Sequence, residues 1–81
     1  MSDYIEAHAY CFNNKPELEK DFSCGCFYCL QIFSPAEIIE WVKDLRGSAI
    51  CPYCGIDSVI GAGSGYPITT EFLKQMHDYW F

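Results

Sequence analysis

The spacing of hydrophobic and polar positions changes several times along the chain, and each change predicts a different element. Residues 3–12 (DYIEAHAYCF) alternate partly between apolar and polar, which indicates a strand, with a helix as the alternative because Glu and Ala favour one. Asn13 and Asn14 precede Pro16 and acidic residues, a pattern typical of a short helix over residues 15–21.

The strongest helix signal lies between residues 34 and 47. Ser34, Pro35 and Glu37 have the spacing of a capping box with proline at the first helical position. They predict a helix that runs between the cysteine pairs to about Leu45 and stops at Gly47. Its apolar residues recur at i, i+3, i+4 and i+7, which predicts one buried stripe. That stripe contains Ile38, Trp41, Val42 and Leu45.

The remaining pattern predicts two strands, a loop and a last helix. Strands are expected over residues 30–33 and 56–60, and the small residues 61–65 (GAGSG) predict a flexible connector. This segment lacks the Lys and Thr of a phosphate-binding loop. Thr69 or Thr70 is expected to cap a helix that reaches the end of the sequence. Its apolar stripe contains Phe72, Leu73, Met76 and Trp80.

Composition indicates a small folded protein. The 81 residues are 51% hydrophobic and 17% aromatic, which excludes a disordered chain. We expect a single domain over residues 1–81, and a chain of this length gains from a cross-link or a metal. The first residues carry acids instead of the basic and apolar regions of a signal peptide, and no apolar run is long enough for a membrane span. We therefore expect a cytoplasmic protein without a membrane partner.

The candidate chemistry lies in the six cysteines. Cys26 and Cys29 form one CxxC pair, Cys51 and Cys54 form another, and residues 30–50 separate them. Two such pairs are the usual pattern of a four-thiolate zinc site, because each short turn directs two sulfur atoms to one ion. We expect one Zn²⁺ per chain; disulfide or redox use of the thiols is the alternative.

Other residues near these pairs have two interpretations. His8, Cys11 and Cys24 are either buried packing residues or alternate ligands that form a second metal site. Asp57 and Ser58 follow the second pair and are candidates for hydrogen bonds to its sulfur atoms.

The second pair, Cys51-Pro-Tyr-Cys54-Gly55, resembles the metal-binding turns, or knuckles, of zinc-ribbon and rubredoxin-like proteins. The first pair departs from the rubredoxin pattern, because Leu30 stands where rubredoxins have glycine, and this favours zinc over redox iron. Most of the chain also looks like small uncharacterised bacterial cytoplasmic proteins with paired CxxC motifs. The resemblance implies a zinc-binding fold and carries no activity with it.

CPYC is also the redox motif of glutaredoxins, where it lies near the N-terminus and opens a helix that lowers the pKa of the attacking thiol. Here the motif lies past the middle of the chain, precedes glycine and a strand pattern, and has a partner pair upstream. The position disfavours the redox enzyme. Thiol redox chemistry or rubredoxin-like electron transfer stays an alternative function.

The net charge of the chain indicates which kind of partner it can bind. Eleven acidic residues oppose five basic ones, which gives a net charge of −6. Nucleic-acid affinity requires clustered Lys and Arg, so a nucleic-acid-binding zinc ribbon is a weaker alternative. We expect a protein partner instead, and a basic one would complement this charge. The aromatic side chains beside the cysteines are candidates for its interface. These are Phe27, Tyr28 and Tyr53.

Together these patterns predict a small α+β zinc ribbon, with two CxxC knuckles on short antiparallel strands, a helix between the knuckles and a C-terminal helix. A four-cysteine site leaves no open coordination position for a substrate, so we expect a protein that is not an enzyme and that regulates or inhibits a partner. The sequence carries no signal for an oligomeric state.

Overall fold

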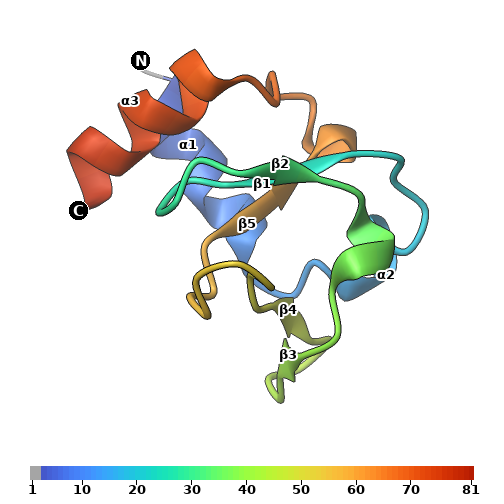
Figure 1. Cartoon of the computed structure of the whole chain (residues 1–81). Coiled ribbons are helices and arrows are strands. Elements are labelled where there is room, and N and C mark those ends of the chain that lie inside the picture. Colours follow the sequence, from blue (N-terminus) through green and yellow to red (C-terminus); the bar gives the residue numbers. More distant parts are fainter. Residues whose placement is uncertain (1–2) are drawn as a thin grey trace.

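The computed structural model describes residues 3–81, which form short helices around two small antiparallel sheets (Figure 1). The α-helices are α1 (Asp3–Glu6), α2 (Lys15–Leu18) and α3 (Thr70–Trp80). The 3₁₀ helices are η1 (Ala7–Cys11), η2 (Pro35–Glu37) and η3 (Ala62–Ser64). The strands are β1 (Cys24–Cys26), β2 (Ile32–Phe33), β3 (Trp41–Val42), β4 (Ser48–Ala49) and β5 (Val59–Gly61).

The central sheet joins distant parts of the chain. Its strand order is β2-β1-β5, and both pairings are antiparallel. Strand β1 leads into the first cysteine pair, and β5 follows the second, with Cys26 opposite Val59. The expected strands over residues 30–33 and 56–60 are confirmed in part. Strand β2 covers only the end of the first range, and β5 begins later than the second range and ends one residue beyond it.

The two faces of this sheet cover different hydrophobic clusters. Cys24, Cys26 and Val59 lie in one cluster, whereas Ile60 lies in the other, because neighbouring strand residues point to opposite faces. Helix α3 packs on the second face. A Cβ at Gly25 would lie 2.7 Å from Cδ1 of Leu73, so the missing side chain lets the helix approach β1 closely.

Helix α3 agrees with the sequence pattern. Thr69 caps it through a hydrogen bond from the amide of Phe72 to its hydroxyl, with a donor–acceptor distance of 3.2 Å. Three members of the expected stripe are buried, namely Phe72, Leu73 and Met76, whereas Trp80 is 38% exposed. The C-terminal helix is confirmed, and its apolar face covers the sheet.

The strand indicated for residues 3–12 is wrong, and the helical alternative is confirmed for residues 3–11. This segment lies beside α3 (Figure 1). The indole nitrogen of Trp80 donates to the carbonyl oxygen of Tyr4 at 3.2 Å, and the ring of His8 stacks on that of Trp80 at 3.9 Å. Aromatic contacts with α3, which no local pattern shows, therefore favour the helical conformation.

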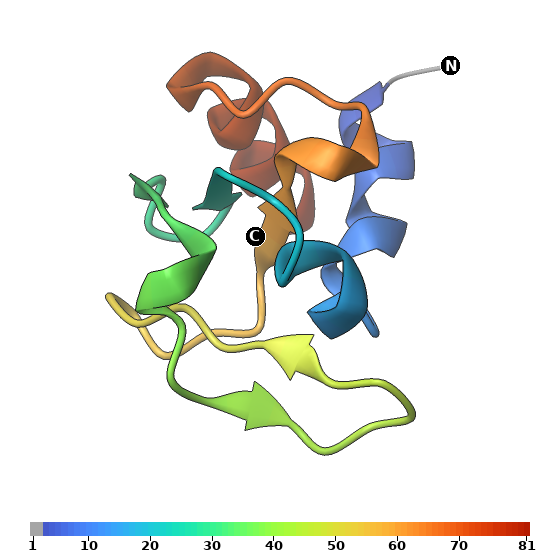
Figure 2. The ribbon, with the colours of Figure 1, turned by 90° about the vertical axis from the view of Figure 1, so that its right-hand side faces the viewer.

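The helix expected from residue 34 to Leu45 is also wrong. The capping box is present, but the helix that it caps is only the short η2, and the backbone is extended at Ile38. The following apolar residues are β-branched or aromatic and favour extended structure. They enter a hairpin in which β3 pairs with β4, as Figure 2 shows. Leu45 lies at its exposed tip and is 88% exposed, so no buried helical stripe forms.

The turn of this hairpin explains why the pattern was misleading. A carboxylate oxygen of Asp44 accepts a hydrogen bond from the amide of Gly47 at 2.7 Å, and Asp44 also contacts the hydroxyl of Ser48. Gly47 has a φ of +97°, which glycine adopts readily. The segment KDLRG therefore carries a turn signal that competes with the helical spacing.

The short helix expected over residues 15–21 is confirmed in part as α2. Asn14 precedes it but makes no side-chain cap bond. Its buried amide instead donates to the carbonyl oxygens of Tyr10 and Val59, at 2.9 and 2.8 Å, and accepts from the amide of Ala49 at 3.1 Å. Asn14 thus joins η1, β5 and β4, a role the sequence did not indicate.

Leu73 provides a test of the packing on the sheet. We expect Leu73→Ala to lower the free energy of unfolding by about 2–5 kcal/mol, because it removes a fully buried side chain beside Gly25. Gln75→Ala, on the exposed side of the same helix, should change it by less than about 0.5 kcal/mol. Urea unfolding of both variants measures the difference, and equal effects would contradict this packing.

Candidate metal centre

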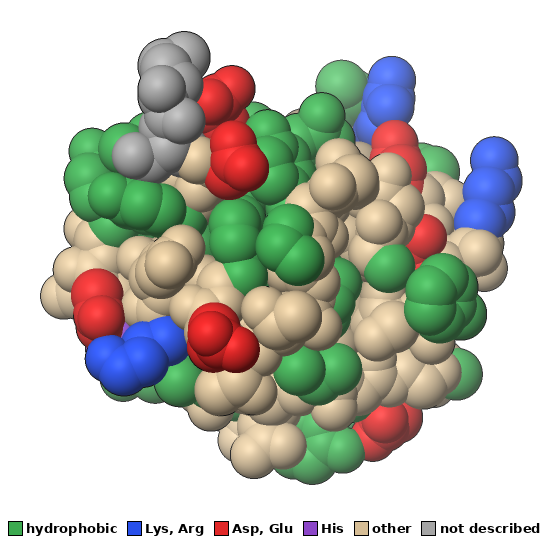
Figure 3. Space-filling view, turned by 90° about the horizontal axis from the view of Figure 1, so that it is seen from above, with side chains coloured by type: hydrophobic (Ala, Val, Ile, Leu, Met, Phe, Trp, Pro, Cys, Tyr) green, Lys and Arg blue, Asp and Glu red, His purple; other side chains and the backbone are tan. Residues whose placement is uncertain are grey.

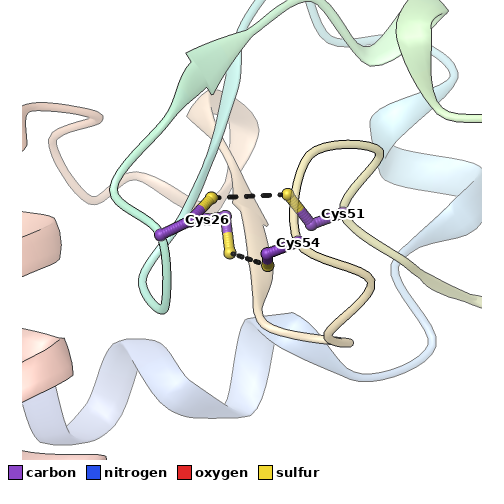
Figure 4. Close-up of side chains that lie close together, drawn as sticks. Cys26, Cys51 and Cys54 are labelled. Carbon is purple, nitrogen blue, oxygen red and sulfur yellow. Dashed lines mark hydrogen bonds between the residues drawn. The ribbon is translucent and has the colours of Figure 1, made fainter.

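Four cysteine side chains from two separate loops meet at one point. The sulfur atoms of Cys26, Cys29, Cys51 and Cys54 all lie within 4.8 Å of one another. The sulfur of Cys26 lies 3.6 Å from that of Cys54, and the sulfur of Cys29 lies 3.6 Å from that of Cys51. Figure 4 shows the side chains of Cys26, Cys51 and Cys54 close together. The structure therefore brings together the two CxxC pairs that the sequence singled out.

The spacing fits a tetrahedral ion. A zinc–sulfur bond of about 2.3 Å places two sulfur atoms of a regular tetrahedron about 3.8 Å apart. The two closest sulfur–sulfur distances between the loops are 3.6 Å, close to that value. Four thiolates are also the donor set that tetrahedral zinc or iron selects. The residues present thus fit a single metal site.

The first knuckle is a tight turn closed by its own backbone. The amide of Leu30 donates to the carbonyl oxygen of Cys26 at 2.9 Å, and the amide of Cys26 donates to that of Gln31 at 3.0 Å. These bonds place residues 27–30 in a loop that turns both sulfur atoms to the same side.

The second knuckle repeats the first bond by bond. The amide of Gly55 donates to the carbonyl oxygen of Cys51 at 2.9 Å, and the amide of Cys51 donates to that of Ile56 at 3.0 Å. Two copies of one turn, facing each other, therefore supply two sulfur atoms each. The first knuckle is also tied to the chain after the second one, because the amide of Phe27 donates to the carbonyl oxygen of Ser58 at 2.9 Å.

Both turns require a left-handed residue after their second cysteine. Gly55 has a φ of +78° and fills this position without strain. Leu30 occupies the equivalent position with a φ of +66°, a conformation that costs a non-glycine residue about 1–2 kcal/mol. The departure from the rubredoxin pattern at Leu30 thus changes the residue and leaves the turn intact. Leu30 packs against the cluster under α3, which offsets part of that cost.

Amide and hydroxyl groups around the site point at sulfur. The amides of Tyr28 and Tyr53 each donate to the first cysteine of their own knuckle, at 3.4 Å. The hydroxyl of Ser58, which is buried, lies 3.0 Å from the sulfur of Cys26. The expected hydrogen-bonding role is thus found for Ser58. Asp57 is exposed and makes no hydrogen bond to the four sulfur atoms within residues 3–81.

These contacts set the acidity of the thiols. Burial opposes the ionisation of Cys26, but hydrogen bonds from Ser58 and from nearby amides outweigh it and lower its pKa. Burial raises the pKa of Cys29 to about 11 and also raises that of Cys54. Cys26 therefore supplies the most readily ionised of these three thiols, and a cation that binds here must displace protons from the others.

The remaining candidate ligands lie outside this group. Cys24 is fully buried, and its sulfur lies 3.5 Å from the carbonyl oxygen of Phe33. Cys11 is buried in the cluster under α3, and His8 stacks on Trp80. Within residues 3–81, no metal-binding group contains any of these three side chains. Burial raises the pKa of both Cys11 and Cys24 to about 12, which keeps these thiols neutral.

The aromatic side chains at the knuckles divide into buried and exposed ones. Phe27 is only 1% exposed, so it is a core residue and not part of the expected surface. Tyr28 and Tyr53 are 44% and 56% exposed. Tyr28 packs edge-on against Phe81 with a ring separation of 4.8 Å, and the hydroxyl of Tyr53 bonds to Glu37.

Comparison of the chain with protein-family models, curated proteins and solved structures finds no significant match. The cysteine cluster is consistent with a zinc-ribbon-like knuckle site. The wider resemblance to small bacterial proteins is not matched by any relative in these comparisons. In residues 3–81, no helix has both the length and the apolar character required to span a membrane.

Removal of one ligand tests the site. We expect Cys51→Ser to abolish stable metal binding and to unfold most of the protein, because three sulfur atoms hold the ion far less tightly than four. Cys24→Ser is the matched control, since it changes a buried cysteine outside the cluster. Elemental analysis and circular dichroism of both variants measure the effect. Equal metal loss in both would show that the ligand set is different.

The buried thiols predict a pH dependence at high pH. Below the ordinary thiol pKa of 9.0, Cys11 is neutral in the folded and unfolded states and favours neither. Its folded pKa is about 12, so between these values folding requires the thiol to keep a proton that the unfolded chain releases. Stability should therefore fall as pH rises from 9 towards 12, by up to about 1.4 kcal/mol per pH unit.

Cys11→Ala isolates this effect. The variant should be less stable at neutral pH, because a buried side chain becomes smaller, but its stability should fall less steeply above pH 9. Urea unfolding at stepped pH gives both slopes. Parallel curves for the two proteins would contradict the assignment of a raised pKa to Cys11.

Proposed function

We propose that this protein is a zinc-binding module in which one Zn²⁺ joins the two knuckles, and that it acts by binding another protein as a regulator or inhibitor. The observation that carries the proposal is the convergence of four cysteine sulfur atoms within 4.8 Å. Four protein ligands fill a tetrahedral coordination sphere, so the ion has no open position for a substrate. Such an ion stabilises the fold and leaves the task of the protein to its surface.

The surface supports a protein partner over a nucleic acid. Eleven acidic residues face five basic ones, and nucleic acid would meet mainly like charge. On the face shown in Figure 3, apolar side chains reach the surface among acidic groups. Tyr28 and Phe81, which contact each other beside the first knuckle, are 44% and 58% exposed. Clustered aromatic residues are common energetic centres of protein interfaces.

A rubredoxin-like electron carrier is the second candidate. The amide–sulfur hydrogen bonds of Tyr28 and Tyr53 favour it, because such bonds stabilise thiolate ligands of iron as well as of zinc. Iron and zinc take the same four-sulfur geometry. The identity of the bound ion therefore separates the two functions, since iron would colour the protein red and zinc leaves it colourless.

Metal analysis and chelation test the proposal. The purified, reduced protein should be colourless and contain one zinc per chain. A strong chelator should unfold it, because the knuckles lose the ion that joins them, and added zinc should restore the circular dichroism spectrum. A stoichiometric red iron centre would establish the electron carrier instead. A protein that stays folded without metal would contradict both candidates.

The partner is tested separately. Zinc-loaded protein immobilised as bait should retain a specific protein from its native extract, and Tyr28→Ala combined with Phe81→Ala should weaken retention at least about tenfold. Ile39→Ala, which removes another exposed apolar side chain far along the chain from both, is the matched control. Equal loss with the control would place the interface elsewhere.

A further inference from the structure

A cavity of about 400 Å³ lies beside Gly61 at the end of β5 and has no role in the metal centre. Its walls come from the end of η1, α2, the tip of the β3–β4 hairpin and the glycine-rich turn η3. Figure 2 shows α2 lying between η3 and that hairpin. Segments that are far apart in the sequence thus line the cavity. None of the lining residues is one of the four clustered cysteines.

The lining combines apolar and acidic side chains. Phe12 and Leu45 lie at the cavity and are 48% and 88% exposed, so apolar surface there is open to a ligand. Glu17 and Asp21 contribute two carboxylates. Within residues 3–81 neither carboxylate has a hydrogen bond or an ion pair with a side chain, although the structure contains ion pairs elsewhere.

The glycine-rich turn accommodates one of these carboxylates. A Cβ at Gly63 would lie 2.5 Å from Oδ1 of Asp21, and a Cβ at Gly61 would collide with Oδ2. These two glycines therefore allow the carboxylate to lie directly against the turn. A phosphate ligand on the same turn would meet the negative charge of Asp21. The segment GAGSG is thus part of an acidic wall and does not form an anion-binding loop.

We propose that this cavity binds a lysine side chain of the partner protein. A lysine has an apolar stem that would contact Phe12 and Leu45 and an ammonium group that would pair with Glu17 and Asp21. The net charge of −6 supports a basic partner. Arg46 at the cavity opposes a cation, but its charge is outnumbered by the two carboxylates. This inference rests on the proposed function, because it names the chemistry of the partner.

Peptide binding to the zinc-loaded protein tests the inference. The probe is the blocked pentapeptide Gly-Gly-Lys-Gly-Gly, its neutral match has Gln in place of Lys, and inorganic phosphate is the anionic control. Backbone amide shifts should change in a saturable way for the lysine peptide, centred on the segments that line the cavity. The glutamine peptide should bind at least about fivefold more weakly, and phosphate should produce no saturable change there.

Variants with opposite expected effects make the test specific. Asp21→Asn should weaken lysine-peptide binding about fivefold, and Arg46→Gln should strengthen it about twofold by removing a like charge. Asp57→Asn removes an exposed carboxylate outside the cavity and should leave binding unchanged. The amide spectrum of each variant reports whether it is folded. Equal weakening by Asp21→Asn and Asp57→Asn would indicate general charge attraction and overturn the inference.

The outcome is separable from that of the proposed function. If the protein contains zinc and is folded but shows no saturable shifts with the lysine peptide, the cavity assignment is wrong and the zinc module stands. If the folded protein binds the peptide at the cavity but contains iron or no metal, the zinc module is wrong and the cavity assignment stands.

Discussion

The approach of the two knuckles to each other is the constraint on which the rest of the structure depends. Each knuckle is closed by two backbone hydrogen bonds of its own and directs two sulfur atoms to one point. Four sulfur atoms within 4.8 Å, however, are favourable as thiolates only with a cation between them, because like charges at this separation repel. A cation bound between them would therefore hold the two loops in contact.

The central sheet transmits this constraint to the remaining chain. Strand β1 enters the first knuckle and β5 leaves the second, and the pairing of Cys26 with Val59 fixes their register. Since successive strand residues face opposite sides, the same two strands present sulfur on one side and Gly25 and Ile60 to α3 on the other. Holding the knuckles together therefore also positions the surface on which the C-terminal helix packs.

The sequence predicted the parts of the structure that depend on local chemistry. The CxxC spacing identified the clustered cysteines, and the cap at Thr69 with its apolar stripe identified α3. Residues whose conformation depends on distant partners were missed. The apolar residues from Ile38 to Leu45 have the spacing of a helix, whereas pairing with β4 and the turn at Gly47 determine their extended form.

Asn14 and Leu30 show why other local conformations could not be predicted from the sequence. Asn14 fits a helix cap, yet its amide bonds to three separated segments, which become neighbours only in the folded protein. Leu30 gives no sign of a left-handed conformation, and only its equivalence to Gly55 in the paired turns explains it. In both cases the tertiary arrangement determines the local conformation.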